Sequence, residues 1–279
     1  MCNTCGCNIT PGNRHLLFEV PEKKAVSTVS VLSNLLKHND RQAERNRARL
    51  DAGGALAINL MSSPGSGKTA LLEATIQRLK ERIWIAVIEG DLETENDALR
   101  IRAQGVPAHQ ITTGTACHLD AHLIHNALDH LDLDRIELLF VENVGNLVCP
   151  ASFDLGHHRN VTLLSVTEGD DKPAKYPVMF RAADLMLITK TDLLPYLGDF
   201  SPEKAEQCQR ALASKAPVMR VSARSGDGLE AWLDWLEGEV AQHKERLKQK
   251  QTLRPRIQQD GRLLHGEAPL IRFRPVAQT

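Results

Sequence analysis

The sequence predicts an α/β fold in which a mostly parallel central sheet is flanked by helices. Short apolar runs alternate with helical segments along the chain, the pattern of parallel strands that are covered on both faces. The first run leads into a Gly- and Ser-rich loop that ends in Lys-Thr. Acidic residues follow two later runs directly, and functional groups gather at the carboxyl ends of parallel strands.

Composition sets limits on the class of protein. A chain of 279 residues can bury a substantial core, as one large domain or two small ones. Its formal net charge of −1 gives no overall attraction to nucleic acid or to anionic membranes, so we expect neither as a partner. Apolar runs are short and the N-terminus lacks a signal peptide, which indicates a cytoplasmic protein. Its six cysteines then indicate thiols or metal ligands rather than disulfides.

Three cysteines lie at the N-terminus, at Cys2, Cys5 and Cys7. Thiolates at this spacing can converge on one soft or borderline metal, and the α-amino group is close enough to join them. A C-x-x-C pair can also be a redox dithiol, but redox pairs usually lie near a βαβ unit, and this one precedes a stretch without clear periodicity. The pattern favours a metal-binding segment, which we expect to be flexible and to span residues 1–26.

A helix is predicted next, over residues 27–53, packed on the domain that follows. Gly53 and Gly54 end it. The charged run over residues 39–49 is most simply its solvated face. The apolar side chains that share its other face are Val31, Leu32, Leu35 and Leu36.

A phosphate-binding loop opens the main domain, which we place at residues 54–237. The apolar run 56–61 predicts a strand, residues 62–69 a loop, and the next residues a helix. The backbone N–H groups of such a loop and the N-terminus of its helix both attract phosphate. Lys68 is expected to reach the β- and γ-phosphates, and Thr69 to ligate Mg²⁺.

One position departs from the usual G-x-x-x-x-G-K-[ST] pattern, because Ser62 replaces the first glycine. A Gly/Ser loop that precedes a lysine by chance is the alternative. The order of strand, loop and helix favours nucleotide binding, as in P-loop NTPases. The residues expected to contact nucleotide here are Ser63, Pro64, Gly65, Ser66, Gly67, Lys68, Thr69 and Ala70.

Two acidic residues at strand ends are candidates for catalysis together with Lys68. The apolar run 83–88 leads to Asp91, a candidate for holding Mg²⁺ or the attacking water. The run 136–141 leads to Glu142 in the Walker B arrangement, in which a carboxylate holds the Mg²⁺ shell. Either carboxylate alone can also be a helix cap. Thr69, Asp91 and Glu142 are therefore the predicted Mg²⁺ ligands.

Further apolar runs predict strands at residues 161–166, 185–188 and 218–221. After the second of these, the [NT]-K-x-D pattern indicates a guanine site. The Asp192 carboxylate is expected to accept hydrogen bonds from guanine N1–H and its amine, while the stem of Lys190 packs along the base. Ser222 and Ala223 fit the loop that meets guanine O6. These motifs favour GTP over ATP, although Thr189 stands where asparagine is commoner.

A second cysteine group lies within the main domain. Cys117-His118 precedes a predicted helix over residues 119–131, and Cys149 follows the Walker B segment. If the sheet brings the two loops together, two thiolates and an imidazole can bind a metal, within one chain or between two. A Cys-His pair alone is more often structural. His122 and His125 are interpreted mainly as surface residues.

Together these motifs resemble the HypB family, nickel-incorporation GTPases of hydrogenase maturation in the dimeric, SIMIBI-type P-loop class. Many relatives carry a histidine-rich tract after the N-terminus, and this chain does not, which puts bulk nickel storage in doubt. The motifs that carry the resemblance are the N-terminal C-x-x-C-G-C, residues 62–69, 89–91, 117–120, 142–150, 165–169 and 189–196.

The resemblance implies slow, Mg²⁺-dependent GTP hydrolysis to GDP, nucleotide-dependent homodimerisation, and nickel delivery to the large subunit of [NiFe] hydrogenase with a HypA-type partner. It assigns a tight nickel site to the N-terminal cysteines, and a second site for Ni²⁺ or Zn²⁺ to Cys117, His118 and Cys149. Because these residues adjoin the Asp91 and Glu142 segments, we expect metal affinity to depend on the nucleotide.

Two other interpretations stay open from the sequence. One is a metal-binding scaffold with a vestigial nucleotide site. The other is a SIMIBI GTPase that serves urease or cobalamin enzymes, against which the N-terminal cysteines argue. Residues 238–279 lie outside the resemblance; we expect a basic helix end and then a flexible tail, for which a docking role is a hypothesis.

Overall fold

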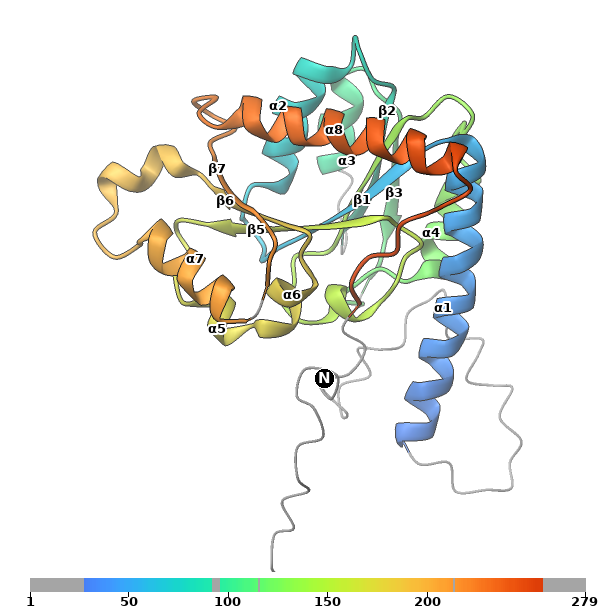
Figure 1. Cartoon of the computed structure of the whole chain (residues 1–279), viewed down its shortest axis with the longest axis horizontal. Coiled ribbons are helices and arrows are strands. Elements are labelled where there is room, and N and C mark those ends of the chain that lie inside the picture. The colour runs from blue at the N-terminus through green and yellow to red at the C-terminus, as the bar shows by residue number, and fades with distance from the viewer. Residues whose placement is uncertain (1–27, 92–95, 115, 213, 258–279) are drawn as a thin grey trace, which may run out of the picture.

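A seven-stranded parallel sheet forms the centre of the molecule (Figure 1). The computed structural model describes residues 28–91, 96–114, 116–212 and 214–257. The strand order is β3-β2-β4-β1-β5-β6-β7, and each neighbouring pair is parallel. The α/β fold predicted from the alternating pattern is therefore confirmed. The strands are β1 Leu56–Met61, β2 Ile85–Asp91, β3 Ala108–Thr112, β4 Leu138–Glu142, β5 Arg159–Ser165, β6 Leu185–Thr189 and β7 Val218–Val221.

Helices cover both faces of this sheet, with α2 and α8 on one side and α6 and α7 on the other (Figure 1). The α-helices are α1 Thr28–Gly53, α2 Lys68–Leu79, α3 Asn96–Ala103, α4 Ala121–Leu128, α5 Lys172–Lys175, α6 Pro177–Ala182, α7 Pro202–Ala211 and α8 Leu229–Lys248. Two short 3₁₀ helices, η2 Cys149–Ser152 and η3 Thr191–Tyr196, follow β4 and β6.

The central strand β1 is buried along its whole length, which explains its continuous apolar sequence. Leu56, Ile58 and Leu60 face the cluster formed with α2 and α8. Ala57 faces the opposite cluster, where α1 contributes Leu50. Because both faces are packed, β1 is held firmly where it runs into the phosphate loop.

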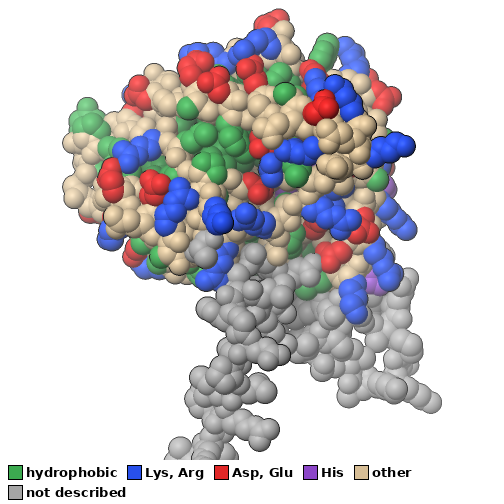
Figure 2. Space-filling model, viewed as in Figure 1, with side chains coloured by type: hydrophobic (Ala, Val, Ile, Leu, Met, Phe, Trp, Pro, Cys, Tyr) green, Lys and Arg blue, Asp and Glu red, His purple; other side chains and the backbone are tan. Residues whose placement is uncertain are grey.

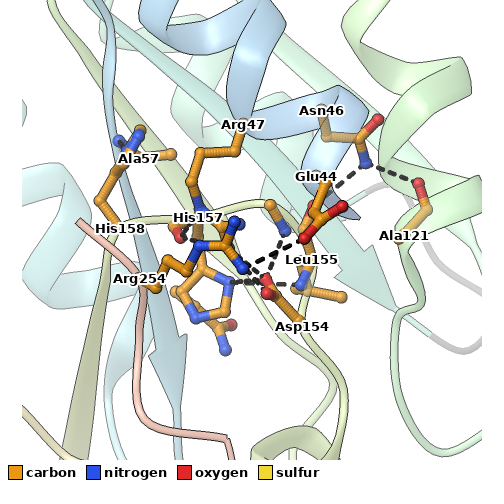
Figure 3. Close-up of polar contacts among 12 residues, drawn as sticks. Glu44, Asn46, Arg47, Ala57, Ala121, Asp154, Leu155, His157, His158 and Arg254 are labelled. Carbon is orange, nitrogen blue, oxygen red and sulfur yellow. Dashed lines mark hydrogen bonds and ion pairs between the residues drawn. The ribbon is translucent and has the colours of Figure 1, made fainter. Parts of the chain in front are cut away.

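Helix α1 is attached to the domain by buried polar contacts as well as apolar ones (Figure 3). Arg47 Nη2 lies 2.6 and 2.7 Å from the two carboxylate oxygens of Asp154, and its Nε donates to the His157 carbonyl. Asn46 Nδ2 donates to the carbonyls of Ala121 and Leu155. The prediction that residues 39–49 form a solvated face was wrong for Arg47, which is buried.

The C-terminal part of the described chain packs back onto the domain. Helix α8 crosses residue 238 without a break, and residues 249–257 then return past α1 toward β5 (Figure 1). Thr252 Oγ1 donates to Asp51 Oδ1, Arg254 pairs with Glu44, and Asn160 Nδ2 donates to the Arg256 carbonyl. In the described ranges, no helix has both the length and the apolar character needed to cross a membrane. A cytoplasmic location stays a prediction.

Candidate nucleotide and metal site

The phosphate loop joins β1 to α2 at the carboxyl end of the sheet. Gly65 and Gly67 adopt φ of 73° and 95°, a left-handed conformation that favours glycine. Lys68 is the first residue of α2, so the loop directs its N–H groups and the helix N-terminus to one place. Ser62, at the position of the missing glycine, is buried and accepts hydrogen bonds from Lys68 Nζ at 3.0 Å and from Ser66 Oγ. Ser62 thus stabilises the loop through its hydrogen bonds with Ser66 and Lys68.

The acidic residues predicted to hold Mg²⁺ gather beside this loop. Glu142 ends β4, next to β1, and its Oε1 accepts from Thr69 Oγ1 at 3.1 Å. Lys68 Nζ lies 3.9 Å from the same oxygen. Asp91 ends β2 and lines the same pocket, with Gly145. The fold therefore brings Lys68, Thr69, Asp91 and Glu142 to one pocket, and their roles toward Mg²⁺ stay a prediction.

Glu89 is a buried acid in this pocket that the sequence analysis passed over. It lies opposite Glu142 in the parallel register of β2 and β4. Burial, and then repulsion from Glu142, raise the pKa of Glu89 to about 10. Burial also raises the pKa of Glu142, although Lys68 opposes this. The signal in the sequence was an acid inside an apolar strand, two residues before Asp91.

The donor set fits Mg²⁺, which prefers hard oxygen ligands. Glu89 Oε1 and Glu142 Oε2 are buried without a hydrogen-bond partner among the described residues. Burying such an oxygen costs free energy unless a hydrogen-bond donor or a cation contacts it. Thr69, Asp91 and Glu142 are the residues that would hold the ion or its waters. Glu89 lies beside Glu142 on the neighbouring strand and lines the same pocket.

The base pocket lies beyond the phosphate loop and is continuous with it. Gly67, Ala70 and Lys190 line both parts. Asp192 Oδ1 accepts from Ser222 Oγ at 2.7 Å, so the segments that follow β6 and β7 meet at this pocket. The other residues that line the base part are Ser66, Leu71, Thr189, Leu193, Val221, Ala223 and Arg224.

Two side chains fasten the base loop to the phosphate loop. Lys190 Nζ donates to the Gly65 carbonyl at 2.6 Å, and Thr189 Oγ1 donates to the Ser66 carbonyl at 2.7 Å. The threonine that replaces the commoner asparagine therefore still holds the two loops together. Pro64 and Gly65 line the phosphate part. Ser63 differs from the other predicted nucleotide contacts: it lines neither part, and its hydroxyl donates to Glu168.

The fold also brings Cys117, His118 and Cys149 together. The two sulfur atoms are 3.5 Å apart, and His118 Nδ1 lies 3.7 Å from Cys117 Sγ. These separations suit two sulfurs and one nitrogen that each lie about 2.0–2.3 Å from one metal ion. His118 is fully buried and its ring stacks on Phe153 at 4.1 Å, which fixes its orientation.

Cys117 is readily deprotonated in this group, and its thiolate form attracts a cation. Hydrogen bonding from Cys149, and then from His118, lowers the pKa of Cys117 to about 4. The same contact with Cys117, reinforced by burial, raises the pKa of Cys149. One thiolate is thus available readily, and a bound metal would have to displace the second proton.

A second group of possible metal ligands, Asp51, His158 and His243, has a different chemistry. His158 Nδ1 accepts from the Ala57 N–H at 2.9 Å, so its proton lies on Nε2 and is donated to Asp51 at 3.0 Å. His158 therefore has no free nitrogen lone pair for a metal. We interpret this group as a polar contact between α1, the residue before β5, and α8.

His122 and His125, interpreted from the sequence mainly as surface residues, are half-buried on α4. His125 Nδ1 lies 3.1 Å from Arg49 Nη1 and 3.2 Å from Asn46 Oδ1. Cys2, Cys5 and Cys7 lie outside the described residues, so the N-terminal nickel site stays a prediction.

Known proteins resemble this chain over most of the described sequence. The family model described as "CobW/HypB/UreG, nucleotide-binding domain" matches residues 56–220. The chain is 57% identical to the hydrogenase maturation factor HypB of Escherichia coli K12 over 204 residues, which is 73% of this chain and 70% of that protein. It is 58% identical to the HypB of Azotobacter vinelandii over 232 residues, 83% of this chain and 76% of the relative.

Two solved structures share the fold. HypB from Helicobacter pylori in complex with nickel aligns with a TM-score of 0.70 at 40% identity, over 77% of this chain and 97% of that one. HypB from Archaeoglobus fulgidus aligns with a TM-score of 0.69 at 42% identity, over 74% and 100% of the two chains.

Fold and site together define a P-loop nucleotide-binding protein of the α/β class, in which two cysteines and a histidine that could hold a metal ion lie close together. The match to this domain, and the matches that cover 70% and 76% of two relatives, narrow the class. The chain belongs to the HypB family of hydrogenase maturation factors.

Proposed function

We propose that this protein is a GTPase that carries nickel and delivers it to the large subunit of [NiFe] hydrogenase. One observation supports this most directly. Residues 143–148 connect Glu142 in the phosphate pocket directly to Cys149 in the group of possible metal ligands, which gives a short route by which bound nucleotide would affect bound metal. The protein would act as a homodimer with a HypA-type partner. A relative's structure in complex with nickel makes nickel the first metal to test.

In the proposed reaction, the chain's own residues position the triphosphate. Lys68 contacts the β- and γ-phosphates, and the phosphate-loop N–H groups hold the rest. Mg²⁺ would neutralise charge that develops on the transferred phosphoryl group. Asp91 orients the attacking water or the ion's hydration shell, and Glu142 fixes the Thr69 hydroxyl.

The base pocket supports guanine as the substrate base. A carboxylate at Asp192 accepts from two donors, guanine N1–H and the exocyclic amine, which adenine does not present at the same places. GTP is therefore the proposed substrate and GDP the product.

The test is a nickel titration of the reduced, full-length protein against a chelator, with GDP and with a non-hydrolysable GTP analogue. A Cys2/Cys5/Cys7→Ala variant is the matched comparison. We expect the tight site to vanish in the variant and a weaker, nucleotide-sensitive site to remain. Equal nickel affinity in the two nucleotide states would remove the proposed switch. If no nickel binds, the GTPase assignment survives without its cargo.

A further inference from the structure

Residues 143–149 are bonded to the end of β1 and to the phosphate loop that follows it. The Asn143 N–H donates to the Leu60 carbonyl at 3.0 Å, and the Asn146 N–H donates to the Ser62 carbonyl at 2.8 Å. Gly145 packs so closely that a Cβ there would lie 2.8 Å from Pro64 Cα. A displacement of the loop must therefore move this segment as well.

The opposite side of the segment reaches the cysteines through one side chain. Asn146 Nδ2 donates to the Cys117 carbonyl at 3.3 Å. Its Oδ1 accepts from the N–H groups of Val148 at 2.8 Å and Cys149 at 3.4 Å. A single amide thus contacts the backbones of both cysteine ligands, while the backbone of the same residue is bonded to Ser62.

We propose that Asn146 is the positioning residue through which the phosphate loop sets the relative placement of Cys117 and Cys149. The inference rests on the proposed nucleotide-dependent metal site. Metal–sulfur bonds require a narrow range of distances, so a small shift between the two cysteines changes the affinity for a metal. Without the Asn146 side-chain amide, the carbonyl of Cys117 loses its hydrogen bond to this segment, and the N–H groups of Val148 and Cys149 lose the acceptor that holds the turn, while the backbone bond to Ser62 remains.

Asn143 makes a different set of contacts, which separates its role from that of Asn146. Its Oδ1 accepts from the Leu119 N–H, and its Nδ2 donates to Asn59 Oδ1 at 3.1 Å. Asn59 in turn donates to Asn160 across the sheet. Asn143 therefore supports the fold near the site, whereas the Asn146 side chain contacts the ligand residues themselves.

The experiment uses the full chain with Cys2, Cys5 and Cys7 changed to Ala, so that nickel reports only the second site. Nickel affinity is measured by competition with a chelator, once with GDP bound and once with a GTP analogue bound. The quantity compared between variants is the ratio of the nickel affinities in these two nucleotide states. This chain with the three N-terminal cysteines changed is the parent of the variants below. If nucleotide and metal binding are coupled with ordinary strength, the two affinities of the parent differ by roughly fivefold or more, in either direction. We expect Asn146→Ala to bring the ratio within about twofold of one while nickel and nucleotide each still bind.

Two further variants distinguish positioning from folding. Asn146→Asp keeps the acceptor for Val148 and Cys149 but lacks the donor to Cys117, so it preserves the turn and is expected to lose the coupling as well. Asn126→Ala, at an exposed asparagine on α4, is expected to keep the parent ratio.

The outcomes separate the two proposals. A parent ratio that the Asn146 variants retain overturns only the role of Asn146. Loss of nickel binding in both nucleotide states overturns it too, because the residue is then simply structural. A ratio of one in the parent overturns the nucleotide-dependent metal site, and the role of Asn146 with it.

Discussion

The Asp192 side chain accepts a hydrogen bond from Ser222, the residue that follows β7. Ser222 Oγ donates to Asp192 Oδ1 at 2.7 Å, and both residues line the base pocket. Replacement by asparagine puts a donor where guanine also presents donors. Because a hydrogen bond to a charged group is worth about 1.5–3 kcal/mol, we expect Asp192→Asn to reduce the preference for GTP over ATP by roughly 10- to 100-fold.

Competition binding of GTP and ATP measures this preference. Ser222→Ala is the control, because it removes the orienting hydroxyl and keeps the carboxylate; its loss of preference should be smaller. Unchanged guanine selectivity in the Asp192 variant would show that another residue reads the base.

We expect His157 to make the free energy of unfolding depend on pH. It is fully buried, its Nδ1 accepts from the Leu155 N–H, and its Nε2 therefore donates to Asn160 Oδ1 at 2.7 Å. Burial lowers its pKa to about 4, so below pH 6.5 the unfolded chain binds a proton that the folded chain excludes. Its neutral form thus supports the fold above about pH 6.5, and that support falls as the pH drops toward 4.

The expected contribution is a loss of about 2 kcal/mol in the free energy of unfolding between pH 7 and pH 5. Urea unfolding at the two pH values should show this loss in the wild type and a smaller one in His157→Gln. The exposed His130→Gln is the control and should behave as the wild type does. An unchanged slope in His157→Gln would mean that other groups cause the acid sensitivity.

Residues of the site differ in how well sequence could predict them. The loop glycines, Lys68, Thr69 and Asp192 belong to motifs whose spacing is set by the shape of a nucleotide, so their positions follow from the pattern alone. Glu89 has no such spacing. Its importance comes from the register that sets it opposite Glu142, and register is a property of the folded sheet.

At the level of elements, the strands with continuous apolar runs were predicted, and β3 was missed. Its sequence, Ala-His-Gln-Ile-Thr, has no apolar run, because β3 lies at the sheet edge and pairs only with β2. Helix α4 begins at Ala121 rather than at residue 119. The Asp120 side chain accepts from the N–H groups of His122 and Leu123 and so caps it, a signal that an apolar-periodicity argument passes over.

Helix α1 depends on its buried ion pair with the segment before β5. Arg47 and Asp154 are 3% and 14% exposed, so removal of the cation leaves a largely buried carboxylate without its partner. We expect Arg47→Met to lower the free energy of unfolding by about 3–5 kcal/mol. The helix also carries Arg49, whose pair with Asp129 is 32% and 58% exposed.

Arg49→Met is therefore a control on the same helix, with an expected cost below about 1 kcal/mol. Urea titrations of the two variants measure the difference. Similar costs for both would mean that α1 is held mainly by its apolar contacts, such as Leu50 in the cluster beneath it.

For the whole molecule, the C-terminal part of the chain closes the fold and should be treated as part of the domain up to residue 257. The sequence showed only a basic run there, because the partners of these residues lie far away in the chain. His243 packs against His158 with ring centroids 4.4 Å apart. Thr252 donates a hydrogen bond to Asp51, which also accepts one from His158.

We therefore expect truncation after Gln242 to destabilise the whole domain. It removes buried His243, the Thr252 contact and the Arg256 carbonyl that accepts from Asn160. Loss of several such contacts should cost roughly 2–4 kcal/mol, seen as a lower Tm and a lower urea midpoint. A chain that ends at residue 257 keeps these contacts and is the matched control. If the shorter chain is as stable as the control, the packed segment adds nothing to the fold. If it is not, a docking role for the C-terminus must be tested by removing only residues 258–279, since a longer deletion would impair partner binding through instability alone.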